Sequence, residues 1–134
     1  MKNIILAFCL LLTPFALTAG DLSPETIEGA TTVDTAKAKA LFDAGTKFVD
    51  VRRSSEFEAG RIPDAIPLDL KKAFSKESLA AQVKPDEAVV MYCNGPKCPR
   101  SAKASKMAVE WGYTKVYYYR EGIPAWKAAS NPVE

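Results

Sequence analysis

Histidine is absent from this sequence and cysteine is scarce. The 134 residues contain no His and three Cys. A tetrahedral structural zinc site takes four Cys or His ligands, which this composition does not supply in full. We therefore expect no metal site, and no motif implies an organic cofactor.

An excess of charge of one sign is also lacking. The chain has 18 Lys and Arg against 16 Asp and Glu, a formal net charge of +2. Proteins that bind nucleic acid or anionic membranes carry a marked basic excess, so no nucleic-acid partner is expected. The 48% hydrophobic and 25% charged content is ordinary for one globular domain.

The apolar run near the N-terminus is too short to cross a bilayer. It covers Ile4–Leu12 and follows the positively charged Lys2, whereas a spanning helix needs about 20 residues. Cleavage near Ala19 or Gly20 would remove residues 1–20 as a signal peptide. We expect a periplasmic or secreted protein without stable membrane association after cleavage, and an uncleaved anchor or a first core helix is the alternative.

Turn-prone residues separate this leader from the part of the sequence that is expected to fold. Residues 21–29 are predicted to be a tether, and residues 30–134 a single domain. Strands are predicted at 47–51, near 66–68, at 88–92 and at 116–119, and helices at 35–45, 54–59, 71–83, 100–111 and around Trp126. Their alternation predicts an α/β fold with a small parallel sheet and helices on both faces.

One loop of this predicted sheet carries the chemistry. Cys93 follows the apolar strand 88–92, and Pro99 is placed to open the next helix. Ligands of parallel sheets bind beyond the carboxyl ends of strands, and a helix N-terminus there favours a nucleophilic thiolate. Cys93 is therefore the predicted nucleophile. The candidate substrate-binding and anion-stabilising residues are Arg52, Asn94, Gly95, Lys97, Arg100 and Ser101.

Motifs in this order resemble the rhodanese (sulfurtransferase) family. They are FVDVR at 48–52, EFEAGRIPDAIPL at 56–68, VMYC at 90–93, RSAKA at 100–104, GYTKV at 112–116 and EGIPAW at 121–126. Each motif alone is weak, but the ordered set is specific. The resemblance implies a rhodanese-like fold for the domain.

The resemblance also implies an enzyme of the thiosulfate sulfurtransferase type. Cys93 would take a sulfane sulfur from a small donor such as thiosulfate and hold it as a persulfide. A thiol or cyanide-type acceptor would then remove it. The resemblance makes Asp50 a framework residue and Arg52 a residue of the rim.

The loop departs from the family pattern. The family's arginine follows the cysteine by five residues, whereas Arg100 follows Cys93 by seven and Cys98 stands at the fifth position. A wider loop suits larger oxyanions, so an arsenate reductase or a phosphatase is a further alternative.

Cys98 leaves several hypotheses open. It is a resolving thiol that releases sulfide from the Cys93 persulfide, a passive small apolar residue, or the partner of Cys93 in a permanent structural bridge. The alternative to an enzyme is a sulfur-carrier or thiol-disulfide relay module that uses Cys93 and Cys98 without efficient turnover.

Overall fold

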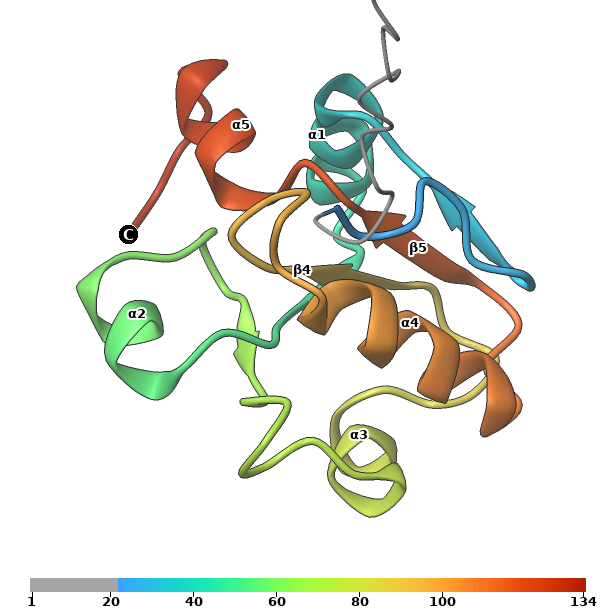
Figure 1. Ribbon diagram of the computed structural model, residues 1–134. Coiled ribbons are helices and arrows are strands. Elements are labelled where there is room, and N and C mark those ends of the chain that lie inside the picture. Colours follow the sequence, from blue (N-terminus) through green and yellow to red (C-terminus); the bar gives the residue numbers. More distant parts are fainter. Residues whose placement is uncertain (1–21) are drawn as a thin grey trace, which may run out of the picture.

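Strands and helices alternate along the described chain (Figure 1). A computed structural model describes residues 22–134, so the predicted signal peptide lies outside the described residues. In chain order the elements are β1 (Ala30–Thr32), α1 (Thr35–Asp43), β2 (Lys47–Asp50), α2 (Ser54–Ala59), β3 (Ile66–Pro67), α3 (Lys76–Gln82), β4 (Val89–Tyr92), α4 (Arg100–Glu110), β5 (Val116–Tyr119) and α5 (Gly122–Ala128). None of the helices within 22–134 has both the length and the apolar character needed to cross a membrane.

The five strands form one parallel sheet in the order β1-β5-β4-β2-β3. β4 lies in the middle, with Val90 paired to Phe48 of β2 and to Tyr117 of β5. All four β4 residues are buried, as is usual where helices cover both faces of a parallel sheet. The predicted α/β class is confirmed.

Side chains of β4 alternate between two cores. Val89 and Met91 belong to the core that includes residues of α3 and α4, whereas Val90 and Tyr92 belong to the core with α1 and α5. This alternation follows from the two-residue period of a strand. Trp126 of α5 is fully buried in the second core. Figure 1 shows α3 and α4 below the sheet and α1 and α5 above it.

The first strand was not predicted from the sequence. β1 has three residues, lies at the edge of the sheet, and contains no buried residue. A short edge strand lacks the apolar run that marks a buried strand. β1 is recognised as a strand only by its pairing with β5, and that pairing joins residues far apart in the sequence.

The predicted helix 71–83 is shorter in the structure. The Asp69 carbonyl accepts the backbone N–H groups of Lys72, Ala73 and Phe74 and closes a turn over 69–74. Ser75 then caps α3 by accepting the Ser78 N–H, while the Ser78 hydroxyl accepts the Ser75 N–H. This reciprocal cap fixes the start of the helix at Lys76.

Candidate active site

The loop after β4 starts from the middle of the sheet. Cys93 directly follows Tyr92 and is only 1% exposed. The chain then runs through residues 94–99 and enters α4 at Arg100. A buried central strand thus places the cysteine at the carboxyl end of the sheet, next to the N-terminus of a helix of 11 residues.

Cys93 and Cys98 form a disulfide across this loop. Their Cα atoms lie 6.4 Å apart, and the Cys98 N–H donates to the Gly95 carbonyl at 3.0 Å. Cys98 is half-buried, so it is the more accessible of the two cysteines. The structure therefore shows the oxidised pair, and a Cys93 thiol requires reduction.

The first turn of α5 packs closely against the start of the loop. The Ile123 N–H donates to the Cys93 carbonyl at 3.0 Å. Gly122 has φ +67°, and a Cβ atom there would lie 2.3 Å from the Cys93 carbonyl oxygen and 2.8 Å from the Gly95 nitrogen. Because only glycine fits this approach, the turn holds the Cys93 end of the loop.

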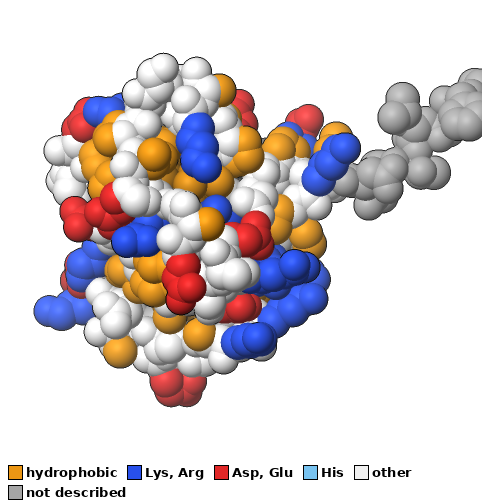
Figure 2. Space-filling view, turned by 90° about the vertical axis from the view of Figure 1, so that its left-hand side faces the viewer, with side chains coloured by type: hydrophobic (Ala, Val, Ile, Leu, Met, Phe, Trp, Pro, Cys, Tyr) orange, Lys and Arg blue, Asp and Glu red, His pale blue; other side chains and the backbone are white. Residues whose placement is uncertain are grey.

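A hollow of about 320 Å³ opens at the disulfide. Its lining residues are Arg53, Glu56, Leu70, Lys71, Cys93, Asn94, Cys98, Pro99, Arg100 and Lys103. A second hollow of about 330 Å³ shares Arg53, Lys71 and Arg100 with it. Cations thus outnumber the single carboxylate beside the cysteines. Figure 2 shows one face of the molecule, where Lys and Arg side chains gather near one edge and acidic side chains are interspersed elsewhere.

Arg100 is anchored in the wall of the hollow. Its Nη1 donates to the Val51 carbonyl and to Asp69 Oδ1, both at 3.0 Å. Asp69 is buried. Burial raises the pKa of the Asp69 carboxyl, but the Lys71 backbone N–H and Arg100 outweigh it and hold that pKa below its ordinary value of 3.8. Arg100 thus contributes a fixed positive charge.

Asp69→Asn is expected to reduce the loss of stability in acid. A carboxylate whose pKa is lowered in the folded protein contributes stability at every pH above its ordinary, unfolded-state pKa. This contribution is lost as the pH falls through the lower pKa of the folded state. The variant is expected to be about 1–3 kcal/mol less stable at neutral pH, with a smaller further loss below about pH 4. Urea unfolding at a series of pH values measures both effects.

The control for this prediction is the exposed carboxylate Asp43, which pairs with Lys39 on the surface of α1. Asp43→Asn should lose stability in acid to nearly the same extent as the wild type. Parallel stability profiles for Asp69→Asn and the wild type would contradict the role assigned to Asp69.

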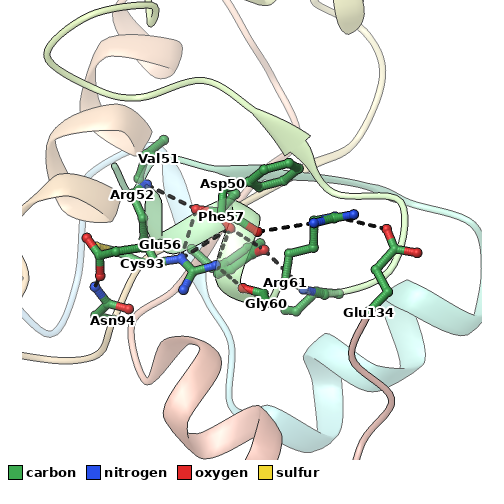
Figure 3. A network of polar contacts seen from close by, with 12 residues as sticks. Asp50, Val51, Arg52, Glu56, Phe57, Gly60, Arg61, Cys93, Asn94 and Glu134 are labelled. Atoms are coloured by element: carbon green, nitrogen blue, oxygen red, sulfur yellow. Dashed lines mark hydrogen bonds and ion pairs between the residues drawn. The ribbon is translucent and has the colours of Figure 1, made fainter. Parts of the chain in front are cut away.

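Asp50 and Arg52 form a buried framework beneath the site (Figure 3). Arg52 donates to Asp50 from Nε and Nη2, with a shortest distance of 2.7 Å, and its Nη2 also donates to the Gly60 carbonyl. The Tyr92 hydroxyl donates to Asp50 Oδ2 at 2.7 Å. Burial, with the Asp50 charge, raises the pKa of Tyr92 well above its usual range.

This arrangement corrects the rim position expected for Arg52. Its guanidinium turns inward to a buried carboxylate, and it does not line the hollow. The neighbouring Arg53 is exposed and lines the hollow instead. Arg52 lies in the bend that follows β2, whereas Arg53 is the N-cap residue of α2, so the two neighbouring side chains belong to different local structures.

The other candidate residues lie at different depths. Asn94 is exposed, and its amide donates to the Glu56 carboxylate in the hollow. Gly95 and Ser101 are buried. Lys97 is exposed and is not among the residues that line the hollow.

Sequence reasoning missed four charged residues of the hollow, namely Arg53, Glu56, Lys71 and Lys103. Arg53 and Glu56 lie within or beside two of the quoted motifs, so a signal for them existed. Lys103 lies on the first turns of α4, within the quoted motif at 100–104, so it too had a signal. Lys71 reaches the hollow through the turn after β3, and nothing in its local sequence marks it.

Comparison with known proteins links this architecture to a family. The family model for the rhodanese-like domain matches residues 34–129. The thiosulfate sulfurtransferase GlpE of Pseudomonas savastanoi pv. phaseolicola is 32% identical over 92 residues, which cover 69% of this chain and 82% of that protein. The HTH-type transcriptional regulator Rv0324 of Mycobacterium tuberculosis is 31% identical over 86 residues, 64% of this chain and 36% of the regulator.

A solved structure shows the same fold. The crystal structure of the BH2092 protein from Bacillus halodurans superposes with a TM-score of 0.70 at 23% identity, and the match covers 78% of this chain and 77% of that one. At this identity the likeness concerns the arrangement of strands and helices.

Proposed function

Because the chain belongs to the rhodanese-like domain family, we propose that it is a sulfurtransferase that carries sulfur on Cys93. The observation that carries this proposal is the position of Cys93 at the carboxyl end of the central strand, in a hollow lined by four Lys and Arg side chains and one carboxylate. A donor that is anionic, such as thiosulfate, fits this charge. The Pseudomonas relative is named a thiosulfate sulfurtransferase, which supports the choice of thiosulfate as donor.

Loading of Cys93 is a displacement at sulfur. The reduced Cys93 thiolate attacks the outer sulfur of thiosulfate, the sulfur–sulfur bond of thiosulfate breaks, and sulfite leaves with the bonding electron pair. The product is a Cys93 persulfide. Arg53, Lys71 and Arg100 supply positive charge near the anionic donor and the leaving sulfite, and the N-terminus of α4 adds its partial positive charge.

Unloading is the same kind of step. Cyanide or an acceptor thiolate attacks the outer sulfur of the persulfide, and the Cys93 thiolate leaves. The product is thiocyanate or a new persulfide. No oxidant or reductant is consumed, so the cycle continues as long as Cys93 stays reduced.

The disulfide supports a second function for the same site. The Cys98 thiolate attacks the inner sulfur of a Cys93 persulfide, the Cys93–Cys98 bond forms, and hydrosulfide leaves with the electron pair. A dithiol reductant must then return both cysteines to thiols. The ring closed by the bridge is short, with a sequence separation of 5, so its entropic stabilisation is small. That favours a reactive role for the bridge over a structural one.

We place this activity outside the cytoplasm. The predicted signal peptide supports export, and disulfides persist in oxidising compartments. In such a compartment the sulfurtransferase depends on a reductant that reopens the Cys93–Cys98 bond.

Cys98→Ser separates the two functions. The variant has no disulfide partner for Cys93, so transfer from thiosulfate to cyanide is expected without prior reduction, whereas the oxidised wild type requires it. Sulfide released from the loaded protein in a single turnover is expected to fall at least about tenfold, the effect of about 1.4 kcal/mol on a rate. Thiocyanate and sulfide are measured on the same samples.

Pre-reduced wild type is the matched control, and its initial rate of sulfur transfer to cyanide, before the disulfide closes, should be close to that of the variant. Equal sulfide release from the variant and the wild type would contradict a resolving role for Cys98. Arsenate and an aryl phosphate, run in parallel, should give no turnover; turnover on either would favour the oxyanion chemistry suggested by the longer loop.

A further inference from the structure

Ser23 lies upstream of the first strand, yet it is only 7% exposed. Its N–H donates to the Pro96 carbonyl and its hydroxyl to the Cys98 carbonyl, both at 2.7 Å. The Ser23 carbonyl accepts Arg120 Nε at 3.2 Å and Nη2 at 2.9 Å. Every polar group of Ser23 is therefore engaged, and two of them hold the loop that carries the cysteines.

The segment around Ser23 is itself fixed to the domain. The Tyr118 hydroxyl donates to the Pro24 carbonyl at 2.9 Å, and Thr32 Oγ1 donates to the Glu25 carbonyl at 2.7 Å. Figure 1 shows the blue beginning of the described chain beside the loop that follows β4. Residues 21–29 were predicted to be a tether, and the described part of them makes specific contacts at the site.

The two ends of the loop are held by different parts of the molecule. The Cys93 end continues β4 and is bound by Ile123. The Cys98 end has an internal bond to Gly95, and Ser23 binds its Pro96 and Cys98 carbonyls. Ser23 lies outside residues 34–129, which match the family model. The residue that binds the Cys98 half of the loop thus lies upstream of the region that matches the family model.

We infer that Ser23 is a positioning residue that stabilises the Cys93–Cys98 disulfide relative to the dithiol. In the oxidised form the covalent bond keeps Cys98 in place. If the Ser23 hydroxyl is removed, the Cys98 carbonyl therefore stays where it is, without a donor and poorly solvated. In the dithiol form the loop can relax and the same carbonyl can reach water. Removing the Ser23 hydroxyl therefore costs more in the oxidised form, since a part-buried acceptor without a donor is unfavourable.

The inference rests on the proposed function only for the part that the pair plays in the reaction cycle. The equilibrium itself needs no sulfur donor. Two protein thiols give two electrons and two protons to oxidised glutathione, which becomes two molecules of reduced glutathione, and the Cys93–Cys98 bond forms. The ratio of the two glutathione forms then sets the fraction oxidised.

The test equilibrates the purified protein in glutathione buffers, traps free thiols by alkylation in acid-quenched samples, and reads the oxidised fraction by intact mass. In Ser23→Ala the equilibrium constant for disulfide formation is expected to fall about tenfold, which corresponds to a potential about 30 mV less negative. Arg120→Met, which removes the donors to the Ser23 carbonyl, should shift the constant in the same direction.

Thr32→Ala is the matched control, because it removes the same kind of hydroxyl-to-carbonyl bond from the same segment without touching the loop. It should leave the constant unchanged. Equal constants for Ser23→Ala and the wild type, or a wild type that stays a dithiol at every glutathione ratio, would overturn the inference. A shifted constant together with no sulfur transfer by the reduced wild type would count against the proposed function alone.

Discussion

Cys93→Ser is expected to reduce sulfur transfer from thiosulfate to cyanide to the background rate, a loss of at least about a thousandfold. That loss corresponds to about 4 kcal/mol of transition-state stabilisation. The serine hydroxyl is a poor nucleophile toward sulfur and cannot hold a persulfide. The measurement is the initial rate of thiocyanate formation by pre-reduced protein.

Cys98→Ser is the matched control, because it removes the same disulfide and leaves the nucleophile. Any general effect of losing the bridge should appear in both variants, whereas the loss of transfer should appear only in Cys93→Ser. Activity of Cys93→Ser above about a tenth of the wild-type rate would show that the sulfur is carried elsewhere.

Asp50→Ala is expected to lower the free energy of unfolding by about 3–5 kcal/mol. The side chains of Asp50 and Arg52 are 0% and 5% exposed, and their closest ion-pair distance is 2.7 Å. The substitution leaves a buried guanidinium and the Tyr92 hydroxyl without their acceptor. Urea unfolding followed by tryptophan fluorescence measures the change.

Asp43→Ala is the control, since its carboxylate is 59% exposed and pairs with Lys39 on the surface of α1. Exposed pairs of this kind contribute little, so the change should stay within about 0.5 kcal/mol. Similar losses in the two variants would mean that burial of the Asp50–Arg52 pair is not what stabilises the end of β2.

The features that sequence reasoning predicted depend on local patterns. The apolar run at 88–92 indicated the central strand, and the structure has β4 at Val89–Tyr92 with every residue buried. The predicted family is confirmed by the match over residues 34–129. Cys93 was located by its place after that strand, because position at a strand end is visible in the sequence.

The features that the sequence did not predict depend on the direction in which a side chain points and on contacts between residues far apart in the chain. Arg52 and Arg53 are adjacent, and only the fold shows that the first turns inward to Asp50 and the second toward the hollow. The bond from Ser23 to the Cys98 carbonyl joins residues 75 positions apart. No local pattern encodes such a contact, because it forms only when the sheet has brought the two segments together.

The most direct test of sulfur transfer through Cys93 is the intact mass of reduced, purified Cys98→Ser protein before and after addition of thiosulfate, because this variant cannot release the sulfur by closing the disulfide. We predict a gain of one sulfur atom that is absent when Cys93 is also replaced by serine and is lost again when cyanide is added. A reduced Cys98→Ser protein whose Cys93 reacts with an alkylating agent but gains no sulfur from thiosulfate would contradict the proposed role of Cys93 with this donor.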